Sequence, residues 1–564
     1  MASSIKVVVS FDFGTTYSGV SYACRKPGQQ PNPSPVCRWP GDSAGRVSND
    51  VKVPTIISYN GLTDFKWGYQ VKLTDKSIVG IKLLLDPDQD KPSYLPGSGK
   101  RTALRSLPKP AVDIAADYIG AVYNHALQEI RKGSVGSFFD TCERDVVLTV
   151  PAVWSDKAKD LTLQAATKAG LGSSITMIKE PEAAAIYTLS EQTLALNKDD
   201  IYVICDAGGG TVDLITYEVS QVYPLDLAEV VPGSGGMAGA IGLNKRFEDS
   251  VRDLIGEAQM AALKAVPDGW SLVLDQFETE IKRKFCGESD RPHYIHFPGV
   301  SLEDDLNYGL ENNTWCIKWN DLQEIFDPLV QHVVRLVDDQ VLASLKKAPL
   351  RPIKAIFLVG GFGSNGYLKA CMEKGFPGTQ IIQPADASSA IMNGAVIYRL
   401  AHGPRVVSRQ ATCHYGVKVL YPKRTPEDDG RETFYDPRDG ITRVEGMDWH
   451  ITKGQELTNE KIKISVFAKV NHPYDFSDLS REHHLWFSKM PSPQVYPDDK
   501  VVKCCRLKSL LWPARHTMKK IPFGANGKPY WTIDYDLVVS AKANLEFSVE
   551  IKGKEYGSVE ASYE

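Results

Sequence analysis

Two segments of this chain share one pattern, an apolar strand that ends in an aspartate and turns through Gly and Thr into a second strand. The first copy spans residues 7–16 and the second spans residues 202–213. Asp12 and Asp206 end the two strands, and Asp213 follows the second turn. Two facing hairpins of this kind can hold one polyphosphate from both sides. The repeat therefore predicts a duplicated α/β core of two lobes, with nucleotide chemistry as the first hypothesis.

The residue types in these turns suit a bound phosphate. Small residues after a strand let backbone N–H groups approach phosphate oxygens closely, because no Cβ intervenes. Thr15, Thr16 and Thr211 add hydroxyl donors. An aspartate at each strand end suits Mg²⁺, which prefers a few carboxylates, keeps several waters and bridges substrate phosphates. One copy alone would be an ordinary capped turn, but two copies together with Asp213 favour a binding site.

A third glycine-rich segment, residues 360–366, follows an apolar strand that ends at Val359. It contains the pattern G-x-G-x-x-G, which alone imitates a dinucleotide-binding fingerprint. A dinucleotide site would leave both Asp turns unexplained, whereas a nucleotide held by those turns still needs a place for its adenosine. We therefore expect this segment to contact adenosine, with a plain strand-to-helix turn as the structural alternative.

Composition narrows the class of protein. A chain of 564 residues exceeds one hydrophobic core. With 43% apolar and 24% charged residues it is typical of globular proteins, and a net charge of −4 favours neither nucleic acid nor an anionic membrane as partner. Its apolar runs have strand length, no leader pattern precedes the first strand, and the ten cysteines lack metal spacing. We expect a cytoplasmic protein, with the nucleus as the alternative.

The pattern of elements changes along the chain. Up to about residue 402 strands alternate with amphipathic helices, one of which is predicted to begin after Ser155 and to end at Gly170 and Gly172. Beyond this point short β-branched and aromatic runs are separated by turn residues. The predicted domains are an α/β domain at 1–402, a linker at 403–411 and a smaller all-β module at 412–564. Within the first domain, lobe I covers about 1–190 plus 395–402, and lobe II covers about 191–394.

Taken together and in this order, the motifs resemble those of the heat-shock 70 family within the actin-like ATPase superfamily. Residues 11–18 resemble its first phosphate loop, residues 206–213 its second, and residues 360–363 its adenosine loop, where typical members have Gly-Gly-Ser. Residues 149–152 and 180–185 resemble the two segments that join the lobes. Within the family, residues 150–154, 180–184, 208–214 and 235–239 resemble most the atypical heat-shock 70 kDa protein 12 group.

The resemblance implies an actin-like, ribonuclease-H-like core of two lobes around an ATP/ADP cleft, with Mg²⁺ held mostly through water and slow ATP hydrolysis. It implies that Asp12 and Asp206 hold the water shell of Mg²⁺, that Asp213 orients or deprotonates the attacking water, and that Glu180 lies near the metal. Pro151 would be a switch pivot. The implied nucleotide-binding residues of the turns are Gly14, Thr15, Thr16, Tyr17, Gly208, Gly209, Gly210, Thr211, Gly239, Gly360, Gly361, Phe362 and Gly363.

Two further groups follow from the resemblance. The family uses a catalytic lysine in its first lobe, and the order and spacing of residues 68–72 make Lys72 our candidate, with an exposed surface lysine as the alternative. Glu278, Lys282 and Arg283, next to Phe277, resemble the helix that sandwiches adenine, although their spacing differs by about one residue from the usual pattern. Here the alternative is an exposed charged helix face.

The C-terminal part departs from the family. The stretch at residues 405–410 lacks the acidic, leucine-rich character of the usual linker, and no long helical lid is expected after the β module. That module is faintly similar to the peptide-binding sandwich, most nearly at residues 533–537. We expect an ATP-driven, chaperone-like switch acting on protein or peptide clients, with co-chaperones unspecified and neither nucleic acid nor membrane as partner. The alternatives are a non-hydrolysing nucleotide-dependent scaffold and a small-molecule kinase of the same superfamily.

Overall fold

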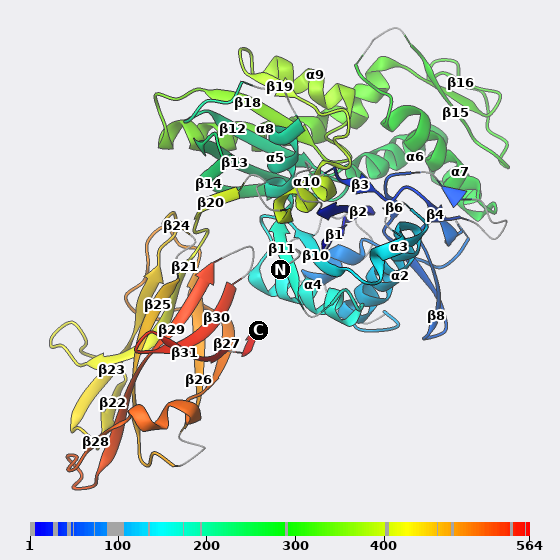
Figure 1. Ribbon diagram of the computed structural model, residues 1–564. Coiled ribbons are helices and arrows are strands. Elements are labelled where there is room, and N and C mark those ends of the chain that lie inside the picture. Colours follow the sequence, from blue (N-terminus) through cyan, green and yellow to red (C-terminus); the bar gives the residue numbers. More distant parts are fainter. Residues whose placement is uncertain are drawn as a thin grey trace. The chain divides into compact units, whose positions relative to one another are not determined.

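The chain consists of two compact units, Met1–Val406 and Val407–Glu564. The computed structural model (Figure 1) describes residues 6–25, 32–41, 47–48, 50–72, 74–86, 107–133, 136–172, 174–191, 195–287, 291–400, 405–458, 461–474, 479–541, 545–558 and 560–563. Over these ranges, no helix combines the length and the apolar character that crossing a membrane requires.

The first unit begins with a sheet in the order β11-β10-β1-β2-β3, with β6 pairing with β2. Its strands are β1 (Lys6–Asp12), β2 (Tyr17–Arg25), β3 (Ser34–Pro35), β6 (Val53–Pro54), β10 (Glu143–Val150) and β11 (Ile175–Lys179). β1 runs parallel to β10 and antiparallel to β2. The apolar residues of β1 are buried on both faces, as is usual where helices or other elements cover both sides of a sheet.

A second sheet in this unit repeats the first. It contains β12 (Ile201–Ala207), β13 (Val212–Gln221), β14 (Asp226–Gly236), β18 (Ile353–Val359) and β19 (Gln380–Ile382), in the order β19-β18-β12-β13-β14. β12 runs parallel to β18 and antiparallel to β13. β1 and β12 therefore hold equivalent places in two sheets of the same order and direction. The duplicated strand-Asp-turn pattern in the sequence corresponds to this duplicated topology.

Two helices, α5 (Glu180–Glu191) and α10 (Ala390–Arg399), lie between these sheets (Figure 1). α10 packs on β1, β2 and β10, α5 packs on β12 and β13, and the two helices pack on each other. Their contact is very close, since a Cβ on Gly394 would come within 1.8 Å of the Ala183 carbonyl oxygen. One continuous apolar core includes residues of both sheets and both helices, such as Val8, Ile186 and Ile204.

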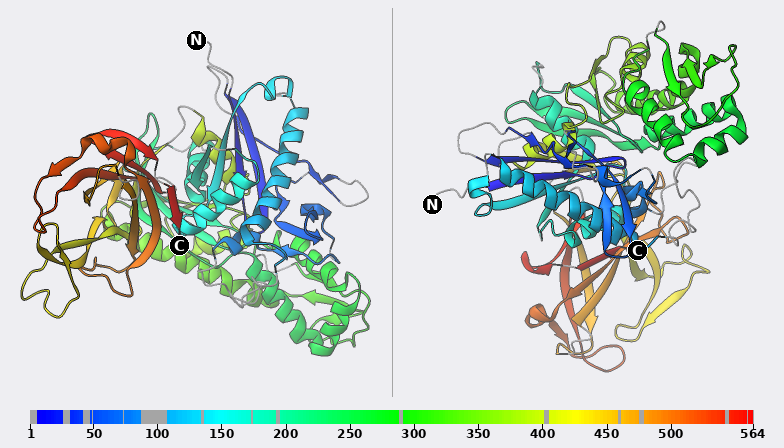
Figure 2. Two further views of the ribbon diagram at one scale, coloured as in Figure 1. Left: turned by 90° about the horizontal axis from the view of Figure 1, so that it is seen from below. Right: turned by 90° about the vertical axis from the view of Figure 1, so that its right-hand side faces the viewer.

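Helices cover the remaining surfaces of the first unit. α2 (Ala111–Lys132) and α4 (Asp156–Lys168) pack together beside the first sheet (Figure 2). The sequence prediction for α4 is confirmed. The Ser155 side chain accepts the Ala158 N–H at 3.2 Å, and Gly170 takes the left-handed conformation just beyond the helix.

The second lobe carries the larger helical layer, which consists of α6 (Ile241–Ala265), α7 (Gly269–Gln276), the π-helix η3 (Phe277–Lys282), α8 (Trp319–Lys347) and α9 (Gly366–Gly375). A small sheet of β15 (His293–His296), β16 (Leu310–Glu311) and β17 (Thr314–Ile317) accompanies them. The short elements of the first lobe are β4 (Trp39–Pro40), β5 (Val47–Ser48), β7 (Ile56–Asn60), β8 (Asp64–Trp67), η1 (Gly68–Gln70), β9 (Ile78–Val79), η2 (Ile81–Leu85) and α3 (Gly136–Phe139).

The second unit contains two antiparallel sheets around one core. The first sheet has the order β22-β23-β21-β26-β27-β32, and the second has the order β25-β29-β30-β31 with β28 pairing with β29. The strands are β21 (His414–Pro422), β22 (Thr433–Asp436), β23 (Ile441–Ile451), β25 (Ile462–Val470), β26 (Ser480–Ser488), β27 (Val502–Leu510), β28 (Lys519–Ile521), β29 (Tyr530–Ala541), β30 (Leu545–Ile551), β31 (Lys554–Ser558) and β32 (Glu560–Tyr563). Side chains from both sheets, such as Leu485 and Leu537, share the core. The short 3-10 helix η4 (Trp512–Thr517) follows β27.

The expected linker at 403–411 contains regular structure. Residues 403 and 404 lie outside the described residues, and Arg405–Gln410 forms strand β20. Three residues of β20, from Ser408 on, pair with β24 (Glu456–Thr458). The boundary between the two units falls inside this strand, after Val406.

Candidate functional site

The candidate site is a cavity of about 730 Å³ between the two sheets of the first unit. Its wall includes the turns that follow the duplicated strands and the turn after β18. The predicted site residues that line it are Asp12, Gly14, Thr15, Thr16, Tyr17, Glu180, Asp206, Gly208, Gly209, Thr211, Glu278, Lys282, Arg283, Gly360, Gly361 and Phe362. Asp12, Asp206 and Gly360 lie at or next to the carboxyl ends of parallel strands, so the cavity lies at the edge where ligands bind in open α/β sheets.

The first and second Gly-Thr turns, residues 13–16 and 208–211, face each other and touch. A Cβ on Gly209 would come within 2.0 Å of Thr16 Oγ1, and one on Gly210 would come within 2.7 Å of Thr15 Cγ2. The Gly208 N–H closes the second turn on the Thr211 carbonyl at 2.9 Å. Glycine is therefore needed in the second turn because a side chain of the first turn fills the space.

Gly210 and Gly239 were predicted to bind nucleotide, but neither lines the cavity. The Gly239 N–H donates to the Gly210 carbonyl at 3.2 Å, and a Cβ on Gly239 would come within 2.4 Å of the backbone of the second turn. Gly239 therefore supports this turn from behind, just before α6.

Four carboxylates cluster at the inner end of the cavity. Asp12, Glu180, Asp206 and Asp213 are each at most 5% exposed. Asp206 and Asp213 are paired across β12 and β13, so both reach the same edge. Asp213 does not line the cavity itself, and its carboxylate accepts the Val153 N–H at 3.4 Å. Such a concentration of buried acids requires positive charge nearby.

Two lysines supply that charge. Lys82 in η2 donates to Glu180 Oε1 at 2.6 Å, and both side chains are buried. Lys52, just before β6, donates to Asp12 Oδ2 at 2.7 Å. The Lys82 ammonium also lies 5.5 Å from the ring centroid of Trp154. Four carboxylates and two ammonium groups leave the cluster with a negative excess when all are ionised.

The pKa values follow this balance. Burial, together with the charges of Asp12 and Asp213, raises the pKa of Glu180 to about 7 despite Lys82. Burial and the neighbouring carboxylates Glu180 and Asp213 hold the pKa of Asp206 well above its usual range. Burial opposes ionisation of Asp12 as well, but the Lys52 ammonium, together with Lys82 and the Thr149 hydroxyl, outweighs burial and lowers the pKa of that carboxyl. Asp206 and Glu180 are thus carboxyls whose ionisation is disfavoured, and a cation bound beside them would favour their charged forms.

This cluster fits a hydrated divalent cation. Asp206 Oδ1 is buried and has no hydrogen-bond partner among the described residues, so it is available to a metal-bound water. Carboxylate oxygens are the ligands that Mg²⁺ prefers, and Mg²⁺ usually keeps several waters. Within the described parts of the chain, no three His, Cys, Asp or Glu side chains are placed to coordinate an ion directly. If Mg²⁺ binds with the nucleotide, Asp206 would hold it through water, beside Asp12 and Glu180.

The third glycine segment folds back on the end of β12. Gly360 has a φ of 87°, and a Cβ there would come within 2.4 Å of Asp206 Oδ1. The N–H groups of Phe362 and Gly363 both donate to the Ala207 carbonyl, at 2.8 and 2.9 Å. Gly360, Gly361 and Phe362 line the cavity, whereas Gly363 does not. A Cβ on Gly363 would meet the Val359 carbonyl oxygen at 1.8 Å, so this glycine is required by the turn itself.

The outer wall of the cavity, formed by Asn244 and by residues of the segment 278–283, carries charged side chains that are hydrogen-bonded to one another. Asn244 Nδ2 donates to Glu278 Oε1 at 2.7 Å, and Lys282 Nζ donates to Asn244 Oδ1 at 2.7 Å. Burial, followed by the charge of Glu278, raises the pKa of Tyr17, and the neighbouring Arg283 guanidinium offsets part of this rise. Tyr17 of the first lobe thereby reaches the Glu278–Arg283 wall of the second.

A π-helix explains the unusual spacing in this wall. Phe277–Lys282 forms the π-helix η3. Backbone hydrogen bonds in a π-helix span five residues, one more than in an α-helix. The departure of about one residue noted in the sequence coincides with this element. The wider turn still places Glu278, Lys282 and Arg283 on the cavity, and Asn365 Nδ2 fixes its end by donating to the Lys282 carbonyl at 2.9 Å.

Lys72, the lysine chosen from the sequence, is not brought to the site. It is exposed, it does not line the cavity, and its backbone N–H donates to Asp75 at 2.9 Å. The structure places Lys52 and Lys82 at the acidic cluster instead. Sequence reasoning missed both. The available signal for Lys82 is its position inside the apolar run of residues 81–85, since a lysine among buried apolar residues requires a charge partner.

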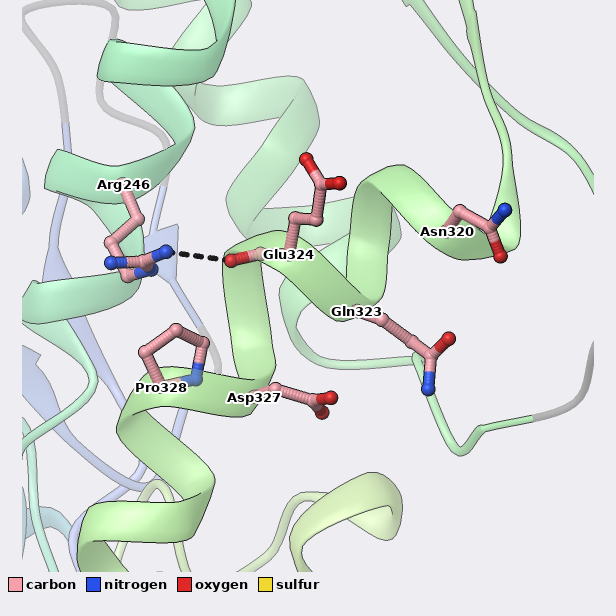
Figure 3. A pocket seen from close by; sticks show the side chains of 6 residues that line it. All are labelled: Arg246, Asn320, Gln323, Glu324, Asp327 and Pro328. Carbon is pink, nitrogen blue, oxygen red and sulfur yellow. Dashed lines mark hydrogen bonds between the residues drawn. The ribbon is translucent and has the colours of Figure 1, made fainter.

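A second hollow of about 570 Å³ lies over the N-terminal half of α8 (Figure 3). Pro328 sits inside this helix and cannot donate to the carbonyl of Glu324, four residues earlier. Arg246 of α6 donates to this carbonyl at 2.7 Å and to that of Ile325 at 2.9 Å. The Arg246 guanidinium is therefore already used to bond carbonyl groups of α8. We interpret the hollow as part of the packing between α6 and α8.

Two sheets of equal topology, two helices between them and facing Gly-Thr turns define the class of two-lobed, actin-like nucleotide-binding proteins. The Hsp70 protein family model matches residues 121–404, half of the chain, and the chain belongs to this family. The resemblance stated from the sequence motifs is confirmed. It extends to the atypical members, since proteins named heat shock 70 kDa protein 12A and 12B are among the relatives.

The relatives cover most of the chain at low identity. Human heat shock 70 kDa protein 12A is 27% identical, with 74% of this chain and 72% of that protein covered. Human heat shock 70 kDa protein 12B is 26% identical, with 76% and 74% covered. A chaperone protein HscA homolog from Burkholderia cenocepacia is 24% identical, with 70% and 58% covered. The chain is thus an Hsp70-like, ATP-binding type of protein, related to atypical and to bacterial members.

Proposed function

We propose that this protein binds ATP and ADP with Mg²⁺ and hydrolyses ATP slowly, using the cycle as a switch that acts on protein clients. The single observation that carries the proposal is the contact of the two Gly-Thr turns beside a buried cluster of four carboxylates and two lysines. Turns of this kind present backbone N–H groups to phosphate, and the cavity of about 730 Å³ is large enough for a nucleotide.

The residues suit phosphoryl transfer to water, which depends on positioning and charge stabilisation more than on covalent chemistry. In the proposal, the N–H groups and hydroxyls of Thr15, Thr16 and Thr211 hold the phosphates. Bound Mg²⁺ would supply charge neutralisation at the phosphate oxygens. Asp213 orients the attacking water, and Lys82, which its bond to Glu180 fixes near the cluster, stabilises the charge that develops on the transferred group.

The outer part of the cavity would take adenosine. Gly360, Gly361 and Phe362 form one side, and the Glu278–Arg283 wall forms the other. Tyr17 comes from the first lobe and Arg283 from the second, and both line the cavity at this point. A nucleotide that contacts both lobes would favour different degrees of lobe closure when it is ATP and when it is ADP.

The client side of the proposal rests on the relatives and on the second unit. One relative is named a chaperone protein, and the second unit presents two antiparallel sheets around their own core. Protein or peptide clients are therefore the proposed partners, with the cytoplasm as the proposed location.

One observation favours the alternative of a nucleotide-dependent scaffold without hydrolysis. Asp12, a carboxylate expected at the metal, is already paired with Lys52. A protein that only holds nucleotide would tolerate this arrangement, because binding needs charge balance but not an activated water.

Calorimetric titration of the full chain with MgATP, MgADP and NAD tests the proposal, followed by phosphate release at saturating MgATP. ATP and ADP binding with phosphate release is the expected result. NAD binding without ATP binding would overturn it, and ATP binding without phosphate release would select the scaffold. ADP formation that depends on an added sugar would instead indicate a small-molecule kinase.

A further inference from the structure

Lys52 is a second cation at the phosphate end of the cavity, and the predicted site residues did not include it. Its ammonium lies 2.7 Å from Asp12 Oδ2, and its side chain is 15% exposed. It also lines the cavity. Lys52 is therefore neither a surface lysine nor a fully buried one. It lines the cavity, and its ammonium group contacts Asp12, a carboxylate expected to hold the metal.

The surrounding residues make room for this side chain. Gly19 lies opposite Asp12 in the register of β1 and β2. A Cβ on Gly19 would come within 3.1 Å of Lys52 Cγ, so the absent side chain leaves the path along which the lysine stem reaches Asp12. The Tyr69 hydroxyl donates to Asp50 Oδ2 at 2.6 Å and lies 3.2 Å from the Lys52 carbonyl oxygen, and these contacts hold the backbone segment in place.

This contact changes the state of Asp12. One carboxylate oxygen accepts from Lys52 and the other accepts from the Thr149 hydroxyl at 2.9 Å. Asp206 Oδ1, by contrast, has no hydrogen-bond partner in the described part of the chain. The two expected metal carboxylates are therefore unequal, because Asp12 has a resident cation and Asp206 does not.

We propose that Lys52 is a phosphate-binding residue whose fixed charge lets this protein bind ATP and ADP without Mg²⁺. An ammonium has three donors, and in the described residues one of them is used by Asp12, which leaves donors for phosphate oxygens. Charge-assisted hydrogen bonds of this kind are among the stronger ones. The proposal rests on nucleotide binding at this cavity, as proposed above, and adds that binding does not need the metal.

The first experiment uses the native full chain alone. ATP and ADP are titrated calorimetrically in MgCl₂ and again in excess EDTA. We expect the Kd of each nucleotide to rise by less than about tenfold in EDTA, which is less than about 1.4 kcal/mol. A rise of tenfold or more, or loss of binding in EDTA, would overturn the proposal whatever the variants do.

Variants then assign the effect to Lys52. Lys52→Met removes the charge and keeps the stem, and Lys52→Arg keeps the charge. We expect Lys52→Met to depend on Mg²⁺ at least about tenfold more strongly than the native chain, and Lys52→Arg to stay near native. Lys66→Met is the matched control, because Lys66 is exposed and forms a similar ion pair with Asp75 at 3.0 Å. Equal Mg²⁺ dependence in Lys52→Met and the native chain would show that Lys52 is not responsible.

The two proposals fail in different ways. If the native chain binds no nucleotide in MgCl₂, nucleotide binding itself is excluded. If it binds in MgCl₂ and not in EDTA, the nucleotide site stands and only the role of Lys52 is excluded. Circular dichroism of each variant checks folding, and the native-chain arm decides the question even where Lys52→Met does not fold.

Discussion

The Thr16 side chain occupies the space in which a Cβ on Gly209 would lie. The two are nearly two hundred residues apart in sequence, yet such a Cβ would be 2.0 Å from Thr16 Oγ1 and 2.5 Å from Thr16 Cγ2. Real Cβ atoms do not approach this closely, so the two turns can meet only because Gly209 lacks a side chain. The close approach of the two lobes at the proposed phosphate position therefore depends on the absence of a side chain at Gly209, as it also does at Gly210.

Gly209→Ala is therefore expected to push the two turns apart. The added methyl group should destabilise the fold by about 1–3 kcal/mol, as overpacked sites do, and should weaken ATP binding. Gly375→Ala is the control, because its Cβ would meet only Val334 Cγ1 at 3.4 Å. Urea unfolding and ATP titration measure both effects. The double variant Gly209→Ala with Thr16→Gly should lose less free energy of unfolding than the sum of the losses in the two single variants. A loss equal to that sum would contradict the contact.

Lys82, rather than Lys72, is expected to support ATP hydrolysis. Lys82→Met removes the cation bonded to Glu180 and should lower phosphate release by about 10²–10³-fold, whereas Lys72→Met should leave it unchanged. The double variant Lys82→Met with Glu180→Gln separates stability from catalysis. It removes the buried charge that Lys82→Met leaves unpaired, so stability should recover, whereas turnover should stay low because the ammonium is still missing. Loss of turnover in Lys72→Met would contradict the assignment.

A buried ion pair joins the two lobes on another side. Lys179 at the end of β11 lies 3.2 Å from Glu229 of β14, with both side chains less than 10% exposed. Lys179→Met should destabilise the protein by about 3–5 kcal/mol, because Glu229 keeps its charge without a partner. The double change Lys179→Met with Glu229→Leu should recover most of this loss. Lys168→Met is the control, since its pair with Asp113 is exposed and should contribute less than about 1 kcal/mol.

His483 predicts an acid sensitivity of the second unit. Burial, with the charges of Arg481 and His484, lowers the pKa of His483 to about 4, and its Nε2 is bonded to the Tyr535 hydroxyl at 2.7 Å. An unfolded histidine titrates near 6.5. Between these values the unfolded chain binds the proton and the folded chain does not, so the contribution is present above about pH 6.5 and is lost as the pH falls toward 4.

The loss amounts to at most about 3–4 kcal/mol, which corresponds to a pKa difference of about 2.5. His483→Gln should flatten the pH dependence of thermal unfolding over this window in the full chain. His516→Gln, a change at an exposed histidine of the same unit, should not. An unchanged slope in His483→Gln would show that another group governs the acid loss.

Much of the site follows from local sequence. Asp12, Thr16, Asp206 and Gly360 are each recognisable because a strand, a turn and a polar end are all encoded within about ten residues. Contact between lobes is not encoded in this way. The exposed Lys72 fitted the expected spacing, whereas Lys82 reaches Glu180 across nearly a hundred residues. A lysine that acts through a distant partner gives no local pattern.

The sequence by itself determined the two-lobed class, the paired turns and the family, because duplicated strand-Asp-turn segments are local and specific. Only the tertiary structure decided which lysines complete the site, that Gly239 and Gly363 support turns from behind, and that the spacing near Glu278 is absorbed by a π-helix. It also placed strand β20 within the expected linker. The physical reason is that turns and strands form from neighbouring residues, whereas charge balance and close backbone approach are properties of segments that meet only after folding.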